Sequence, residues 1–177
     1  SMGFKFGKRN LLITFHPTTL EDSSSEEEFY NLLTALSNIE DTQLIFTKSN
    51  SDIGGRIINK MIDEYVELNH QKAVSYSSLG RLRYLSAMKY VDGVIGNSSS
   101  GLVEAPSFKI GVVNIGNRQK GRAKSSSVID CDSSISEIEK AIKVMFSEDY
   151  KIKIFKISNI YEGKDVSNKI LSVIKSY

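Results

Sequence analysis

Short apolar runs alternate with longer amphipathic segments along the chain, and this alternation limits the possible folds more than any other feature. Runs such as "LLITF" and "LIF" precede stretches in which apolar residues recur every three or four positions. Short runs of this kind are typical of buried strands, and the longer period is typical of helices with one buried face. Strands that alternate with helices predict βαβ units and a parallel sheet.

The alternation predicts about six strands and the helices that join them. The strands are expected at 10–15, 42–47, 72–77, 92–97, 110–116 and 126–131. The helices are expected at 23–39, 54–68, 81–91, 102–107, 134–146 and 166–177. Two helix starts have the spacing of a capping box, Ser25 with Glu28 and Ser134 with Glu137. We therefore predict a single doubly wound, Rossmann-like α/β domain.

Composition agrees with one globular domain and excludes several classes of protein. The chain has 177 residues, of which 40% are hydrophobic and 25% charged. A formal net charge of +2 and no block of like charge longer than Glu26–Glu28 argue against a nucleic-acid partner. The single Cys131 excludes an internal disulfide and a multi-cysteine metal site. Without a signal peptide or a long apolar run, the chain is expected to be cytoplasmic, with no membrane partner.

The first residues have the look of a cloning remnant. The opening "SMG" is typical of the scar that a cleaved tag leaves, and the first predicted strand follows closely. We therefore expect residues 1–9 to be remnant and lead-in, and 10–177 to be one domain cut out of a longer protein.

Polar segments follow several of the predicted strands. They lie at 16–19, 48–52, 77–78, 97–101 and 116–119. In open parallel sheets, ligands bind beyond the carboxyl ends of the strands, so these segments are expected to share one rim. That rim is where the sequence predicts a binding site.

The segment "IGNSSSGLVE" is the strongest candidate within this rim. Its serines precede a predicted helix start, where unpaired N–H groups and the helix dipole favour a phosphate. Arg118 could add a forked, charge-assisted contact. Glu104 would suit a hydroxyl group, such as that of a ribose, because a carboxylate and a phosphate repel each other.

Each candidate also has a structural interpretation. A serine run before a helix is commonly a cap and turn, and Arg118 could be a surface ion-pair partner. His16 could be a satisfied structural histidine, and Asn50 could cap a turn. Taken singly, these interpretations are the commoner ones. Only the shared placement of the residues at strand ends favours a ligand of the nucleotide type.

The sequence lacks the motifs of several common enzyme classes. It has no G-x-x-x-x-G-K-[ST] loop and no G-x-G-x-x-G after a strand, which argues against an NTPase and a dinucleotide enzyme. It has no G-x-S-x-G elbow, which argues against a serine hydrolase. No histidine or carboxylate cluster has metal-ligand spacing, so we predict neither a metal nor a cofactor.

Four segments resemble a known family. They are "TFHPTTLED", "LIFTKSNSDIGG", "YVDGVIGNSSSGLVEAPSFKIGVVNIGNRQKGR" and "YEGKDVSNKIL", in order from about Leu11 to the C-terminus. They resemble the hydrolysing UDP-N-acetylglucosamine 2-epimerases, and within these the branch that feeds sialic-acid and legionaminic-acid synthesis. The resemblance implies a two-domain fold of the glycosyltransferase-B type with its active site between the halves. This chain would be the C-terminal, nucleotide-binding half.

The resemblance also implies roles for individual residues. His16 would be catalytic, near the sugar-phosphate bond, and Asn50 would line the pocket. Ser77 would lie beside the base through its backbone. The residues that would hold the diphosphate, ribose and nucleotide are Ser98, Ser99, Glu104 and Arg118. The acid and base carboxylates would belong to the absent N-terminal half.

The reaction implied by the resemblance is elimination of UDP followed by hydration, which yields N-acetylmannosamine or a 4-acetamido-modified analogue. Alternatives of the same class are a GDP-sugar or a bacillosamine-type UDP-sugar as substrate. An alternative of a different class is a non-catalytic nucleotide-binding or interaction module on the same fold. We expect a UDP-sugar as partner, a homo-oligomeric full-length protein, and no activity from this half alone.

Overall fold

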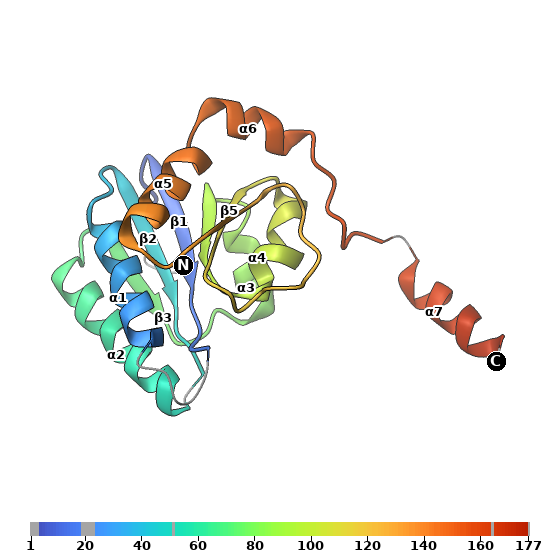
Figure 1. Ribbon diagram of the computed structural model, residues 1–177, viewed down its shortest axis with the longest axis horizontal. Helices are drawn as coiled ribbons and strands as arrows, with labels where there is room; N and C mark the ends of the chain where they lie inside the picture. Colours follow the sequence, from blue (N-terminus) through green and yellow to red (C-terminus); the bar gives the residue numbers. More distant parts are fainter. Residues whose placement is uncertain (1–3, 19–23, 51, 164, 177) are drawn as a thin grey trace.

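The computed structural model describes residues 4–18, 24–50, 52–163 and 165–176. Its centre is a six-stranded parallel sheet in the order β3-β2-β1-β4-β5-β6 (Figure 1). The strands are β1 (Arg9–Thr14), β2 (Thr42–Thr47), β3 (Ala73–Tyr76), β4 (Gly93–Gly96), β5 (Gly111–Ile115) and β6 (Val128–Cys131). The chain builds outward from β1 in both directions, so the strand order reverses between β1 and β4. The predicted doubly wound fold is confirmed.

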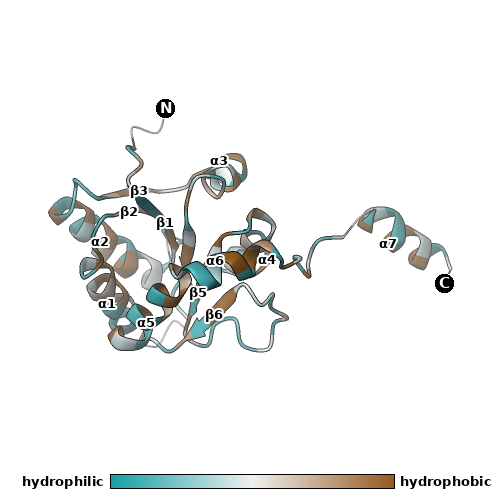
Figure 2. Ribbon diagram, turned by 90° about the horizontal axis from the view of Figure 1, so that it is seen from above, coloured by the Kyte–Doolittle hydropathy of each residue, from teal (hydrophilic) through white to brown (hydrophobic). Residues whose placement is uncertain are grey.

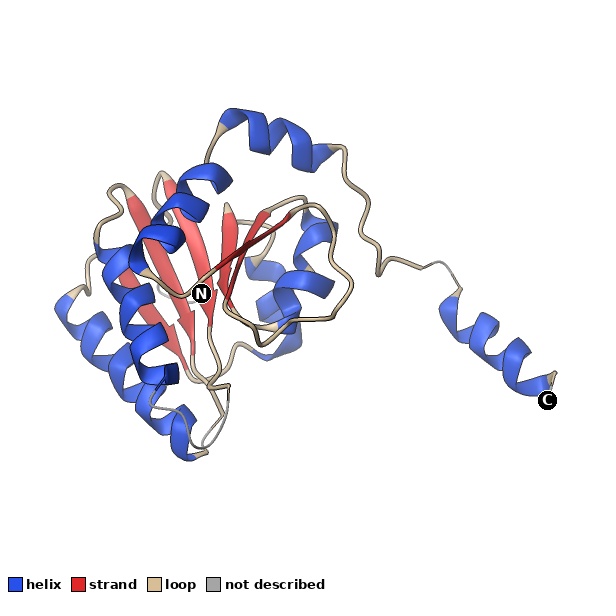
Figure 3. Ribbon diagram, in the orientation of Figure 1, coloured by secondary structure: helices blue, strands red, loops and turns tan. Residues whose placement is uncertain are grey.

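Helices cover both faces of the sheet (Figure 3). One layer contains α1 (Ser24–Ser37), α2 (Ile53–Leu68) and α5 (Ile135–Met145), and α1 contacts both of the other two. The opposite layer contains α3 (Gly80–Ala87), α4 (Ser99–Val103) and the 3₁₀ helix η1 (Ala105–Phe108). These short elements replace full-length crossover helices on that face.

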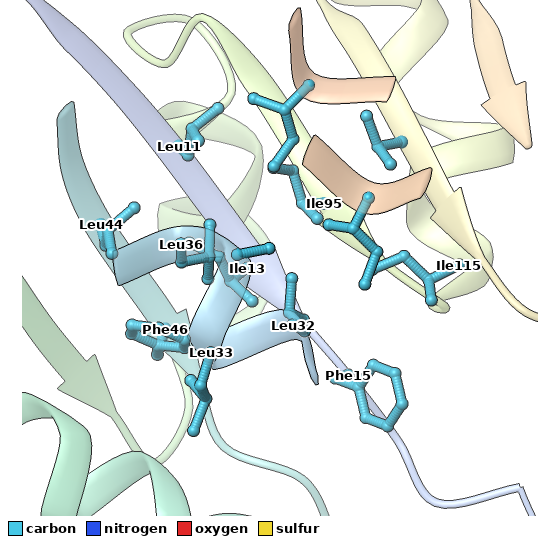
Figure 4. Packing of buried hydrophobic residues seen from close by; sticks show 14 of the residues in the cluster. Leu11, Ile13, Phe15, Leu32, Leu33, Leu36, Leu44, Phe46, Ile95 and Ile115 are labelled. Carbon is cyan, nitrogen blue, oxygen red and sulfur yellow. The ribbon is translucent and has the colours of Figure 1, made fainter. Parts of the chain in front are cut away.

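The alternation of side chains along β1 divides the core between the two faces. Leu11, Ile13 and Phe15 pack with α1, α2 and α5, whereas Leu12 belongs to a second cluster with α3 and η1. Figure 4 shows the larger cluster, in which Leu32 and Leu36 of α1 lie over the strands. Period-two alternation on a strand buried on both faces requires an apolar run without polar interruption. The residues Leu11–Ile13 in β1 meet that requirement.

The helix predicted at 102–107 begins earlier than expected and is divided. It starts at Ser99, with Ser98 as its N-cap, and a separate 3₁₀ turn begins at Ala105. Pro106 explains the break, because proline has no N–H to continue the α-helical ladder. Lys109 closes the turn in the left-handed conformation, with φ of 56°.

The two predicted capping boxes have different outcomes. Helix α1 already includes Ser24, so Ser25 lies inside it and the prediction that Ser25 is its cap is wrong. The Ser25 hydroxyl accepts the Thr18 N–H instead (3.1 Å). Ser134 is the N-cap residue of α5 as predicted, although its side chain makes no capping hydrogen bond.

The sequence did not predict α6 (Glu148–Phe155). Its signals are local: the Ser147 side chain accepts the Tyr150 N–H, and two acidic residues follow in the first turn. Tyr150 and Ile154 are buried, and the Tyr150 hydroxyl donates to the Ser127 carbonyl. This helix therefore packs against the domain although its own apolar pattern is weak.

The predicted C-terminal helix is present as α7 (Val166–Lys175), but none of its residues is buried. It extends away from the sheet and its helices (Figure 1), and apolar and polar residues alternate along it (Figure 2). Of the helices among the described residues, none has the length and apolar character needed to cross a membrane.

Candidate functional site

A cleft of about 600 Å³ lies at the carboxyl ends of the strands β1, β2 and β3, with the loop after β4 as its far wall. Most of the predicted site residues line it, namely His16, Asn50, Ser77, Ser98 and Glu104. Parallel strands bring the loops that follow them to one edge, and this is why residues far apart in sequence meet here. Ser99 and Arg118 are not among the lining residues.

Two asparagine side chains fix the loops that form the cleft. The His16 N–H donates to Asn97 Oδ1 (2.8 Å), and Asn97 Nδ2 donates back to the His16 carbonyl (2.8 Å). Asn59 clamps Ser49 in the same manner, at 2.8 and 3.1 Å. The two clamped residues meet, since His16 Nδ1 lies 3.2 Å from Ser49 Oγ. Each asparagine satisfies both backbone groups of a loop residue, so the loops after β1 and β2 are held in place.

Gly96 permits the close approach of β4 and β1 next to these clamps. Its φ is +139°, and a Cβ at this position would lie 2.0 Å from the Thr14 carbonyl oxygen. A side chain is therefore excluded on steric grounds. The glycine brings Asn97 into register with His16 across the strand ends.

Arg118 and Gln119 approach the site from the loop after β5. Both donate to the Asn97 carbonyl, Arg118 Nη1 at 3.1 Å and Gln119 Nε2 at 2.7 Å. Gln119 is buried whereas Arg118 is exposed. Arg118 thus contacts the first residue of the loop at 97–101, which we call the serine loop. A guanidinium group has five N–H donors, and this bond uses one of them.

The pKa of His16 is lowered from its ordinary value of 6.5. Burial is the main cause because it penalises the charged imidazolium, and the positive charge of Arg118 acts in the same direction. Asp52 acts in the opposite direction, from its place as the N-cap of α2. The neutral imidazole therefore prevails at neutral pH, with one nitrogen able to donate and the other to accept.

The serine loop is tied into a network of hydroxyl groups. Ser98 Oγ accepts from the Ser100 N–H (3.4 Å) and from Ser100 Oγ (3.1 Å). Ser100 Oγ lies 2.6 Å from the hydroxyl of Tyr84, which belongs to α3 and also lines the cleft. Sequence reasoning missed Tyr84, because inside a predicted helix an aromatic residue is typical of ordinary core packing.

The two ends of the cleft differ in chemistry. Ser98 and Glu104, the N-cap and C-cap residues of the short helix α4, belong to one end, and Arg118 contacts the neighbouring Asn97 carbonyl. The other end is formed by Asn50 and Ser77, both exposed, after β2 and β3. This arrangement suits an elongated polar ligand with an anionic part near Arg118 and hydroxyl groups near Glu104. Among the described residues, no group of three or more His, Cys, Asp or Glu side chains could hold a metal ion.

The sequence matches a protein family and several curated relatives. The family described as UDP-N-acetylglucosamine 2-epimerase matches residues 3–175. The chain is similar to the GDP/UDP-N,N'-diacetylbacillosamine 2-epimerase (hydrolyzing) of Campylobacter jejuni, at 40% identity over 85% of this chain and 39% of that protein. It is also similar to the polysialic acid biosynthesis protein P7 of Escherichia coli, at 36% identity over 96% of this chain and 43% of that protein. The chain thus spans less than half the length of these curated relatives.

A solved structure has the same fold. The S. aureus MnaA–UDP co-structure superposes with a TM-score of 0.74 at 17% identity, over 96% of this chain and 45% of that one. The match agrees with the predicted fold class, a parallel sheet that forms one half of a protein of the glycosyltransferase-B type.

Proposed function

The chain belongs to the UDP-N-acetylglucosamine 2-epimerase family, and from that membership we propose that it is the UDP-binding half of a hydrolysing 2-epimerase. The observation that carries the proposal is the convergence of His16, Ser98 and Glu104 on one cleft at the carboxyl edge of the sheet. A structural neighbour of the same fold was solved with UDP, which supports a uridine diphosphate as the ligand.

In this proposal the ligand lies along the cleft with its diphosphate at the serine loop. Ser98 and Ser99 hold the diphosphate, and Arg118 adds a charge-assisted contact from behind. Glu104 accepts from the ribose hydroxyls, and the base lies beside Ser77 with Asn50 on the neighbouring wall. His16 faces the bond between the sugar and the diphosphate.

The proposed reaction is an elimination followed by a hydration. A base removes the proton from C2 of the sugar, and a double bond forms between C1 and C2. At the same time the C1–O bond breaks, and UDP leaves with the bonding electron pair. Water then adds its hydroxyl to C1 and a proton to C2 from the opposite face, which inverts C2. We propose that the neutral His16, which lines the cleft, contacts the departing phosphate oxygen. The carboxylates for the C2 proton are proposed to lie in the other half of the full-length protein.

The substrate is proposed to be a UDP-2-acetamido sugar. UDP-N-acetylglucosamine would give N-acetylmannosamine, and a 4-acetamido sugar would give the corresponding analogue. The 40% identity to a diacetylbacillosamine enzyme favours the second of these two substrates. Turnover of both UDP-sugars and of the matching GDP-sugar by the full-length protein would decide the base and the C4 group.

Binding experiments test the nucleotide site without turnover. UDP should raise the melting temperature of the chain more than uridine does, because only UDP reaches Arg118 and the serine loop. We expect a dissociation constant of about 0.1–1 mM for UDP, because in this proposal the N-terminal half of the full-length protein supplies the other walls of the pocket. Equal shifts by UDP and uridine would contradict the proposed diphosphate position.

A turnover experiment tests the division of labour between the halves. The chain alone, incubated with UDP-N-acetylglucosamine, should release no UDP, whereas the full-length protein should release it continuously. Sustained release by the chain alone would falsify the assignment of the carboxylates to the other half. We also propose that the full-length protein is a homo-oligomer, which light scattering would test.

A further inference from the structure

Tyr84 lines the cleft and connects the sheet to the serine loop through its hydroxyl group. Its hydroxyl lies 2.6 Å from Ser100 Oγ and 3.2 Å from Thr14 Oγ1 at the end of β1. Thr14 Oγ1 is in turn 2.7 Å from Thr47 Oγ1 at the end of β2. A chain of hydroxyl groups therefore runs from the neighbouring strands β1 and β2 through α3 to the loop after β4.

Counting protons gives a direction to the part of this chain that runs from Tyr84 to Ser98; at the other end, the Thr47 hydroxyl donates to the Ile13 carbonyl (3.3 Å). A hydroxyl group has one proton to donate and can accept further bonds. Ser100 donates its proton to Ser98 Oγ (3.1 Å), so the 2.6 Å contact requires Tyr84 to be the donor to Ser100. Ser98 Oγ already accepts from the Ser100 N–H and hydroxyl. The proton of Ser98 is thereby left for a ligand in the cleft.

The surroundings of Tyr84 keep it in the donor form. Burial raises the pKa of its hydroxyl above the ordinary 10.0, although the bonds from Ser100 and Thr14 oppose that shift. The phenol is therefore protonated across the neutral range. Hydrogen bonds in a chain also polarise one another, so a donor at the start strengthens the donor at the end.

We propose that Tyr84 is a positioning residue for the diphosphate: by donating to Ser100, it turns the Ser98 hydroxyl into a donor that faces the anionic part of the ligand. This inference rests on the proposed function, because it needs an anion at the serine loop. It assigns to α3 a part in recognising the phosphates, in addition to lining the cleft.

The test is calorimetric titration of the 177-residue chain with UDP and with uridine. Tyr84→Phe keeps the ring and removes only the hydroxyl. We expect it to weaken UDP binding about fivefold, the factor of one neutral hydrogen bond, and to leave uridine binding unchanged. Tyr90→Phe is the matched control, since Tyr90 is 66% exposed and its ring packs against Phe6. It should change neither affinity.

A double-mutant cycle separates positioning from a general structural role. Ser100→Ala should weaken UDP binding to a similar extent, and Tyr84→Phe should add nothing further in the Ser100→Ala background. The inference would be overturned if the losses of UDP affinity multiplied in the double variant. It would also be overturned if Tyr84→Phe weakened the binding of UDP and uridine equally, or weakened neither. If the unaltered chain binds UDP no more tightly than uridine, the proposed diphosphate site itself is wrong and the inference is overturned with it.

Discussion

The two ends of the sheet carry cavities of similar size, about 600 Å³ at the carboxyl ends of the strands and about 680 Å³ at the amino end of β1, yet their linings differ in kind. The carboxyl-end cleft is formed by loops that present hydroxyl, amide and imidazole groups. The amino-end cavity is formed by the last turns of α1 and α5, with Ala35, Ile39, Ile142 and Phe146 among its lining residues. Cavity volume alone therefore does not distinguish a binding site from a gap between packed helices.

Polar groups at the amino end contact one another. The Arg9 guanidinium lies 4.9 Å from the centre of the Phe146 ring and donates to the Glu40 carbonyl (2.9 Å). Asn38 donates to Glu139 (2.6 Å), which joins α1 to α5. At the carboxyl end, by contrast, the asparagine clamps hold backbone and leave side chains directed at the cleft. The comparison predicts that substitutions at the carboxyl end change function and those at the amino end change stability.

The largest effect is expected from His16→Ala in the full-length protein. Loss of one positioned polar group at a reacting centre should lower kcat by about 10²–10³-fold. Stability should change little, because the Asn97 clamp holds the His16 backbone, which the substitution keeps. Steady-state kinetics and urea unfolding measure the two effects.

His70→Ala is the control for this experiment, since His70 is the second histidine and is exposed at the end of α2. It should leave kcat unchanged. A His16→Ala variant that lost stability but kept normal turnover in its folded fraction would show that His16 is a structural residue.

Arg118→Ala should have the next largest effect, on UDP affinity. A hydrogen bond to a charged group is worth about 1.5–3 kcal/mol, and uridine lacks the diphosphate that receives it. Titration should therefore show a large loss of affinity for UDP and a small loss of affinity for uridine.

Arg122→Ala is the matched control, because it removes an equal charge from the same loop. If both variants weakened UDP binding equally, the effect would come from net charge rather than from a direct contact by Arg118.

At the amino end, Arg9→Met should lower the free energy of unfolding by about 0.5–1 kcal/mol, the value of a cation–π contact at a partly exposed site. The loss stays small because Arg9 Nε is buried without a hydrogen-bond partner among the described residues, so its removal relieves a cost. UDP affinity should not change. A loss of affinity comparable to that of Arg118→Ala would mean that the two ends are coupled.

The smallest effect is a pH dependence that His16 adds to stability. Its folded pKa is depressed, so below about the ordinary value of 6.5 the unfolded chain binds a proton more readily than the folded chain. Stability should therefore fall as the pH decreases from neutral towards the folded pKa of His16. Urea unfolding at several pH values should show a shallower fall for His16→Ala. An unchanged profile would mean that other groups dominate in this range.

Sequence reasoning reached most of the fold because the period of apolar residues is a local signal. It found every strand of the sheet and most helices, and a parallel sheet fixed where the loops must meet. It missed α6, whose apolar pattern is weak. It also placed the start of α4 after Ser99 and did not predict the break before η1, which contains Pro106. It also gave Ser25 a capping role that the observed start of α1 excludes.

The sequence by itself determined the doubly wound sheet, the edge where the loops after the strands gather and the residues placed at that edge, because all three depend on spacing along the chain. Only the tertiary structure decided which side chains contact one another: the Asn97 clamp on His16, the bond from Arg118 to the Asn97 carbonyl, and the contact of Tyr84 with Ser100. These pairs are distant in sequence or belong to different elements. Their hydrogen bonds depend on separations of about 3 Å that no local pattern encodes.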